Sequence, residues 1–142
     1  MPKQVWLKVA AITALTTIFF TTTPAPGSPF AITQHANWAH LAVNCWALWN
    51  MWPRSWKNAL AASAIGMAGI YASQNAVGIS AALFALIGLE WHRYNCKINY
   101  YTIAISLAIS ALLPMVSFTA HALPLAVGLA IWKTNRIYHG RK

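Results

Sequence analysis

Four polar side chains of types that perform acyl transfer lie in apolar surroundings in this sequence. Ser80 has a hydroxyl that becomes nucleophilic when a neighbouring imidazole accepts its proton, and His121 is a candidate for that imidazole. His40 and Asn44 are four residues apart, so they would share one face of a helix. Their N–H groups could stabilise the oxyanion that forms when a hydroxyl attacks a carbonyl group. The four residues together predict a site for nucleophilic attack on a carbonyl.

Each of these residues also has an ordinary structural interpretation. A lone serine in a membrane helix, such as Ser80, usually hydrogen-bonds to a carbonyl of its own helix. A lone histidine near a helix end, such as His121, is commonly a polar residue at the membrane surface. Asn44 could equally form a hydrogen bond between two helices. The functional interpretation therefore requires separate elements to bring these residues together.

The elements that must position the four residues are apolar helices. The 142-residue chain is 58% hydrophobic and 8% charged, whereas soluble domains carry about 25% charged residues. Apolar blocks of roughly membrane length run over residues 5–23, 38–52, 58–74, 78–92, 99–114 and 118–133. We therefore expect an all-α integral membrane protein that forms a single domain over residues 1–142.

The distribution of Lys and Arg favours six spans over four, although several blocks are shorter than the ~20 residues that usually cross a bilayer. The connections 24–37, 75–77 and 115–117 contain no Lys or Arg, so with six spans all ten cations lie on one side. The positive-inside rule makes that side cytoplasmic. We expect a compact six-transmembrane-helix bundle with both termini in the cytoplasm. The first block could instead be a cleaved leader, although prolines crowd the region of cleavage.

Composition excludes several classes of function. The net charge of +9 does not indicate nucleic-acid binding, because the cations lie in pairs between apolar blocks and not on one polar face. Cys45 and Cys96 form no zinc motif, and a disulfide between them is not expected. An aspartyl intramembrane protease is excluded because the chain has no Asp. A zinc protease is excluded because Glu90, the only acid, lies outside any His-Glu-x-x-His motif.

Three segments resemble, in order, the motifs of the rhomboid intramembrane serine proteases, and the resemblance covers nearly the whole chain. Each segment begins a block that enters the membrane from the outer side, so its polar residues lie at a similar shallow depth. The segments are His35-x4-His40-x3-Asn44 in the second block, Gly78-Ile79-Ser80 in the fourth, and Ala120-His121 followed by Gly128 in the sixth.

The resemblance implies that Ser80 is the nucleophile and His121 the general base of a catalytic dyad. It also implies that His40, Asn44 and the backbone N–H of Ser80 form the oxyanion hole. His35 would support the hydrogen-bond network on the outer side. These roles describe an intramembrane serine endopeptidase with a rhomboid-like fold.

Packing would have to orient the imidazole of His121, because the only acid, Glu90, lies at the cytoplasmic end of its block. The resemblance places the ring of Phe84, one turn after Ser80, against this imidazole. Gly128 would contribute to the same packing. We therefore expect a dyad without a carboxylate.

The sequence departs from the family pattern at three places. Ala81 replaces a glycine that usually follows the serine, and Pro124 stands where a glycine is frequent and would kink a helix beyond its first turn. The connection 24–37 lacks the longer insertion of many bacterial members. Small residues in the fourth block would let the sixth approach closely, namely Ala81, Ala85 and Gly88.

The resemblance implies hydrolysis of peptide bonds in or near the transmembrane helix of single-pass substrates, without a cofactor or a metal. The protein would lie in the bacterial inner membrane, with its site near the extracytoplasmic face and the lipid bilayer as its surroundings. One alternative is a catalytically inactive rhomboid-like protein that binds membrane clients. Another is a haem or metal protein that uses His35, His40 and His121. A proton-coupled transporter is disfavoured because no acid lies in mid-membrane.

Overall fold

The structure, a computed structural model, describes residues 3–23, 28, 30–73, 76–94, 97–112 and 117–139. Seven α-helices and one short 3-10 turn form within these residues, which contain no strand. In chain order they are α1 (Lys3–Thr21), the 3-10 turn η1 (Ala31–Thr33), α2 (Trp38–Asn50), α3 (Trp56–Ser73), α4 (Ser80–Leu89), α5 (Trp91–Tyr94), α6 (Lys97–Leu112) and α7 (Phe118–His139). The predicted all-helical fold is confirmed. Cys96, Arg141 and Lys142 lie outside the described residues.

Each predicted apolar block contains one main helix, and the largest differences from the predicted bounds lie in the fourth and last blocks. The fourth block is divided, because α4 stops at Leu89 and the four-residue helix α5 begins after Glu90. The backbone of Glu90 leaves helical geometry, with φ −106° and ψ 31°. The final helix continues to His139, past the predicted end at residue 133. Its added turns are basic, and cations are favourable near the carboxyl end of a helix dipole.

Helix length distinguishes α1 from the other helices. Among the described residues, α1 alone is long and apolar enough to cross a membrane by length and composition. Two further apolar helical segments are shorter, Ser80–Leu89 and Tyr100–Leu112. Helix length and composition therefore do not confirm a membrane bundle, and the six-span arrangement remains a proposal.

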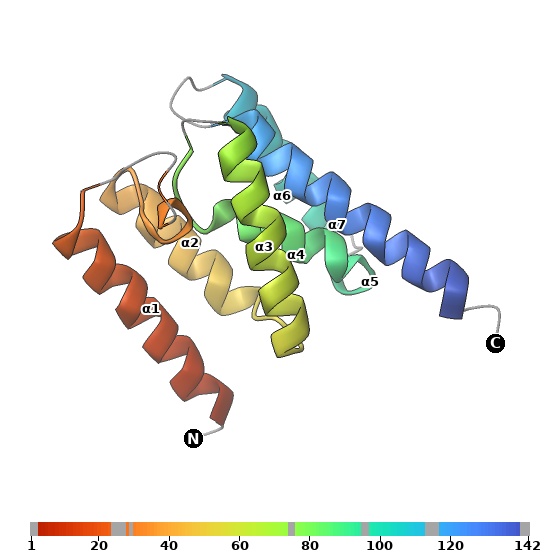
Figure 1. Cartoon of the computed structure of the whole chain (residues 1–142), viewed down its shortest axis with the longest axis horizontal. Coiled ribbons are helices and arrows are strands. Elements are labelled where there is room, and N and C mark those ends of the chain that lie inside the picture. The colour runs from red at the N-terminus through yellow and green to blue at the C-terminus, as the bar shows by residue number, and fades with distance from the viewer. Residues whose placement is uncertain are drawn as a thin grey trace.

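The central element of the fold is α4, which is packed between α3 and α7 (Figure 1). Residues 81–88 are all buried, as expected for a helix that is apolar on every side. Figure 1 also shows that α4 begins inside the bundle, away from the level at which α3 ends. At the edge, α1 lies beside α2, and its Leu15 packs with Leu41, Leu48 and Leu83.

The helices around α4 approach it to backbone contact through small residues. A Cβ added to Gly88 would lie 2.6 Å from the carbonyl oxygen of Leu125 on α7. A Cβ added to Gly66 of α3 would lie 2.5 Å from a backbone nitrogen of α4. The predicted close approach of the fourth and sixth blocks is therefore confirmed at Gly88. Ala81, which was expected to serve the same approach, packs with Ile70 of α3.

Pro124 lies within α7, which is a continuous helix on both sides of it. The proline is fully buried, and its ring faces Gly69 of α3. A Cβ on Gly69 would lie only 2.4 Å from Cγ of Pro124. The glycine thus makes room for a ring that would otherwise force the two helices apart.

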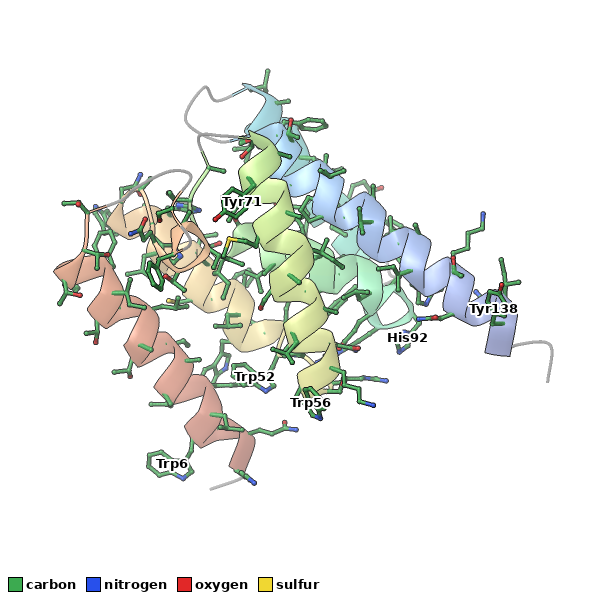
Figure 2. The ribbon with its side chains drawn as sticks, viewed as in Figure 1. Trp6, Trp52, Trp56, Tyr71, His92 and Tyr138 are labelled. Carbon is green, nitrogen blue, oxygen red and sulfur yellow. The ribbon has the colours of Figure 1, made fainter. Side chains whose placement is uncertain are left out.

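Large apolar side chains cover much of the outer surface. Trp6, Trp56 and Tyr138 extend away from the bundle, and they are 62%, 68% and 73% exposed (Figure 2). Other large apolar residues are similarly exposed, among them Trp38, Trp46, Leu60, Tyr101, Ile105 and Leu112. An apolar surface of this extent indicates contact with lipid or with a partner.

A group of polar contacts joins three segments at one end of the bundle. Oε1 of Glu90 accepts hydrogen bonds from the backbone N–H of Arg54 and from Nδ2 of Asn58, both at 2.9 Å. Oε2 forms an ion pair with Arg93 at 3.1 Å. Nearby, Lys8 of α1 donates to a carbonyl near the end of α2. The only acid of the chain therefore holds the segments before α3 and after α4 together.

Candidate active site

Ser80 is the first residue of α4, and a turn at Gly78 leads the chain to it. Gly78 has a φ of +113°, which favours glycine because a side chain would be strained there. Its N–H donates a 2.8 Å hydrogen bond to the carbonyl of Ala31 in η1. The N–H of Ser80 belongs to the first turn of a helix and has no acceptor within that helix. Ser80 thus presents a backbone donor next to its hydroxyl.

The hydroxyl of Ser80 lies 2.8 Å from Nε2 of His121, although the two residues are 41 positions apart. This is an ordinary hydrogen-bond distance. His121 is in the first part of α7 and is 7% exposed, whereas Ser80 is partly buried. The structure therefore brings the predicted nucleophile and the predicted base into contact from separate helices.

The ring of Phe84 packs on the imidazole of His121, with ring centroids 4.8 Å apart and planes inclined by 42°. This is the contact that the family resemblance implied. Gly128 lies about two turns, or ~10 Å, further along α7, so it acts on helix spacing and not on the ring. A Cβ at Gly128 would lie 2.5 Å from the carbonyl oxygen of Ala85 on α4. The expectation that Gly128 helps hold the ring is corrected accordingly.

A residue that the sequence did not single out contacts the other side of the imidazole. The hydroxyl of Ser110, on α6, lies 2.8 Å from Nδ1 of His121 and is 4% exposed. It also lies 2.8 Å from the carbonyl oxygen of Ser106, one turn earlier. The prediction considered only blocks expected to enter from the outer side, whereas Ser110 lies near the predicted outer end of a block expected to run in the opposite direction. That shared depth was the signal that could have found it.

His40 and Asn44 lie against the Gly78 turn, two residues before Ser80. A Cβ built on Gly78 would lie 2.7 Å from Cε1 of His40, 3.1 Å from its Nε2 and 3.4 Å from Nδ2 of Asn44. The missing side chain of Gly78 thus leaves room for both groups. Asn44 is 4% exposed, and its Nδ2 has no hydrogen-bond partner among the described residues. A buried amide donor without an acceptor is a group that a bound oxygen could satisfy.

One long contact of the His40 ring favours a proton on Nε2. Asn37 caps α2 through a 2.9 Å bond that its Oδ1 accepts from the backbone N–H of His40. Nδ1 of His40 lies 3.5 Å from the backbone N–H of Ala36, which can only donate, so this long contact makes Nδ1 the acceptor. In the neutral ring the proton then belongs to Nε2, on the side of Gly78. His40 and Asn44 therefore both present N–H donors to the turn.

His35 packs against His40 from the connection before α2, but neither of its ring nitrogens has a hydrogen-bond partner among the described residues, so the expected hydrogen-bond role is not seen there. It is 1% exposed, and its ring meets that of His40 edge to face with centroids 5.2 Å apart. Burial, together with the neighbouring His40, lowers the pKa of His35 to about 4, although the backbone of Thr33 has the opposite effect. A neutral His35 thus packs behind the donor ring.

The described residues contain no group of three His, Cys, Asp or Glu side chains that could hold a metal ion. His35, His40 and His121, the residues of the alternative haem or metal protein, therefore do not form such a group of three. His35 and His40 are in ring contact, but His121 instead has its two nitrogens beside serine hydroxyls.

The site combines a hydroxyl, an imidazole and buried N–H donors around one turn. Comparisons with protein families, curated proteins and solved structures found no match for the chain. The chemistry is therefore inferred from the site itself. A hydroxyl bonded to an imidazole can attack a carbonyl carbon, and donors beside it can stabilise the resulting oxyanion.

Proposed function

We propose that this protein is a serine-type intramembrane endopeptidase, as the rhomboid proteases that its motifs resemble are. The observation that carries the proposal is the 2.8 Å contact between Oγ of Ser80 and Nε2 of His121. Two features strengthen it: the contact joins separate helices, and the buried amide of Asn44 and the half-buried ring of His40, both from α2, lie beside the turn that precedes the serine. A serine with only a structural role in a helix usually hydrogen-bonds to a carbonyl of its own helix, so it requires neither an imidazole from another helix nor nearby donors.

The proposed reaction proceeds in two stages. Oγ of Ser80 attacks the peptide carbonyl while its proton passes to Nε2 of His121, and a tetrahedral intermediate forms. The imidazolium returns this proton to the leaving amine as the C–N bond breaks, which leaves an acyl group on Ser80. Water then attacks the ester carbonyl while His121 accepts its proton. The bond between the acyl carbon and Oγ breaks, the imidazolium returns the proton to Oγ of Ser80, and the new carboxyl group is released.

The negative charge of the tetrahedral intermediate would be stabilised at the Gly78 turn. Nε2–H of His40 and Nδ2–H of Asn44 point to this region, and the N–H of Ser80 begins the adjacent helix. All three are uncharged donors. Because Asn44 is buried without a partner, a substrate oxygen would replace a missing hydrogen bond and not compete with an existing one.

The apolar perimeter and the positions of the cations support insertion in a membrane. Lys8, Arg54 and Arg93 come from three segments of the chain and line one polar recess at the same end of the bundle. That end contains both chain termini in Figure 1. We propose that it faces the cytoplasm, in agreement with the positive-inside rule.

The shortness of α4 is compatible with this membrane arrangement. Its ten residues span ~15 Å, about half of the hydrocarbon thickness. However, α4 is enclosed by α3 and α7, so residues 76–79 can reach its start as non-helical backbone buried within protein. Such backbone is tolerated at membrane depth when protein or a water-filled cavity surrounds it.

The substrate class follows from this position. A peptide bond within a helix hides its carbonyl from a nucleophile, so a transmembrane substrate must unwind locally before Ser80 can attack. Single-pass proteins with helix-destabilising or small residues near the outer membrane surface are therefore the proposed substrates.

Labelling with a fluorophosphonate probe tests the nucleophile. The purified protein in detergent should be labelled, and Ser80→Ala and His121→Ala should abolish or strongly reduce labelling. Ser63→Ala is the matched control, because Ser63 is an exposed serine on α3, and it should be labelled like the wild type. Labelling that survives in Ser80→Ala would refute the assignment. A folded wild type that is never labelled would favour the inactive, client-binding alternative.

Cysteine accessibility tests the membrane topology separately. In a background with Cys45→Ser and Cys96→Ser, single cysteines at Ser117→Cys and Lys57→Cys are treated with a membrane-impermeant maleimide. We expect labelling at residue 117 in intact cells and at residue 57 only after permeabilisation. The reverse pattern, or equal labelling of both sites in intact cells, would contradict the proposed orientation.

A further inference from the structure

Ser110 makes two polar contacts from a helix whose other described side chains are exposed or half-buried. Of the α6 side chains that the structure describes, Ser110 alone is buried. Its hydroxyl oxygen lies 2.8 Å from the carbonyl oxygen of Ser106 and 2.8 Å from Nδ1 of His121. The hydroxyl therefore bridges the α6 backbone and the proposed base.

The number of protons on this hydroxyl fixes the direction of both hydrogen bonds. A serine hydroxyl has one proton and two lone pairs, whereas a carbonyl oxygen can only accept. Two oxygens can approach to 2.8 Å only with a proton between them, so the hydroxyl proton of Ser110 is directed to Ser106. Ser110 then has only lone pairs to offer to His121.

The state of the imidazole follows from that direction. Because Oγ of Ser110 accepts, Nδ1 of His121 must carry the ring proton. In the neutral ring Nε2 is then an unprotonated acceptor, and it is the nitrogen that faces Oγ of Ser80. The opposite tautomer would place a proton on Nε2, where it could not receive one from the serine.

We propose that Ser110 is a positioning residue that holds His121 in the Nδ1–H tautomer and thereby keeps Nε2 ready to act as the base. The effect on catalysis rests on the proposed function. The tautomer of the imidazole does not depend on it. When His121 becomes an imidazolium, the bridge through Ser110 to the carbonyl of Ser106 also orients dipoles toward the new charge. An uncharged acceptor can do this in an apolar bundle, where an ionised carboxylate would be costly to bury.

The variants Ser110→Ala and Ser106→Ala form a matched pair on one helix. Ser110→Ala removes the acceptor at Nδ1. Ser106→Ala deletes a hydroxyl of the same type but leaves the backbone carbonyl that Ser110 uses. Ser110→Thr restores a hydroxyl at the same position. We expect Ser110→Ala to lower kcat on the order of 10-fold with little change in KM, Ser106→Ala to match the wild type, and Ser110→Thr to recover most of the rate.

The ¹⁵N NMR shifts of the His121 ring provide a measurement that does not depend on activity. Recorded on proteins that carry Ser80→Ala, they should identify Nδ1 as the protonated nitrogen when Ser110 is present. They should reveal a mixture of tautomers with Ser110→Ala. Thermal unfolding in detergent shows whether that variant folds. If it does not, Ser110→Cys replaces it, because a thiol is similar in shape to the hydroxyl but is a weak acceptor, and the same ring shifts are measured.

An unchanged tautomer in a folded Ser110 variant would overturn the inference. So would a full reaction rate in such a variant when Ser80→Ala and His121→Ala are inactive. If the wild type itself has no activity, the proposed function fails, while the ring shifts still decide the role of Ser110. The two proposals can therefore fail independently.

Discussion

At the scale of single residues, the site depends on uncharged groups whose hydrogen bonds are directional. Ser80 and Ser110 bind the two nitrogens of His121, and Phe84 packs against its ring. The proposed oxyanion donors are neutral as well. No carboxylate is near enough to act, since Glu90 is engaged elsewhere with Arg93. The positions of the uncharged donors and acceptors must therefore orient the imidazole and stabilise the oxyanion without the help of a charged side chain.

Asn44→Ala removes one of the proposed oxyanion donors. We expect kcat to fall on the order of 10²-fold with a small change in KM, because the lost bond forms mainly in the transition state. Asn50→Ala is the control, since Asn50 is exposed near the end of the same helix and bonds only to a local carbonyl. Peptidase kinetics on a transmembrane substrate measure the effect. Equal losses in both variants would rule out the specific role of Asn44.

His35 should make stability depend on pH between about 6.5 and 4. The unfolded chain gains a proton on this histidine as the pH falls below 6.5, whereas the folded protein does not until about pH 4. Stability is therefore fully present above pH 6.5 and is lost progressively down to pH 4. We expect His35→Gln to flatten this part of the profile of thermal unfolding in detergent. A profile equally steep in the variant would contradict the assignment.

At the scale of helices, glycines set the distances that the site requires. Gly88 and Gly128 let α4 and α7 touch through their backbones, two turns from the contact between Ser80 and His121. Gly66 does the same for α3 and α4. The nucleophile and the base can meet because these glycines allow the helices to approach so closely.

Gly69→Ala should destabilise the protein through a collision with Pro124. The new Cβ would lie 2.4 Å from Cγ and 2.9 Å from Cδ of the proline, both part of a stiff ring. We expect a loss of about 1–3 kcal/mol in the free energy of unfolding. Pro124→Ala removes the obstacle, so Gly69→Ala should cost much less in that background. Chemical denaturation of the four proteins of this cycle measures the coupling, and simple additivity would contradict it.

At the scale of the whole molecule, an apolar exterior encloses polar groups at two levels. The site lies where α4 begins within the bundle, and the Glu90 group joins the segments at the other end. The exposed tryptophans, tyrosines and aliphatic residues on the outside of the helices provide the surface for lipid in the proposed arrangement. The polar contacts of Glu90 thus join segments at one end of the bundle, and Ser80 and His121 lie nearer the other end.

Glu90→Gln should loosen the end opposite the site. The substitution removes the ion pair with Arg93 and weakens the acceptor for Arg54 and Asn58, at a side chain that is 1% exposed. We expect a loss of about 1–3 kcal/mol in the free energy of unfolding, with fluorophosphonate labelling of Ser80 retained in the folded protein. Arg54→Ala is the control, because Arg54 reaches Glu90 through its backbone N–H, and it should cost under about 0.5 kcal/mol. Equal losses would contradict this role for Glu90.

The sequence alone was sufficient to predict the helical segments and to single out Ser80 and His121, which the structure brings into contact. Apolar blocks report helices directly, and residues such as Ser80, His40 and His121 are identified by type, spacing and their position within a block. It also predicted the contact of Phe84 with His121, through the family resemblance.

Only the tertiary structure decided which helix faces meet. The contact of Ser110 with His121, the fit of Pro124 against Gly69 and the bonds that end α4 at Glu90 all join residues from different segments. Spacing along the chain reports which residues share a face of one helix, but it does not report which neighbour that face packs against. Those contacts follow from how small residues let the helices approach, which is a property of the packed bundle.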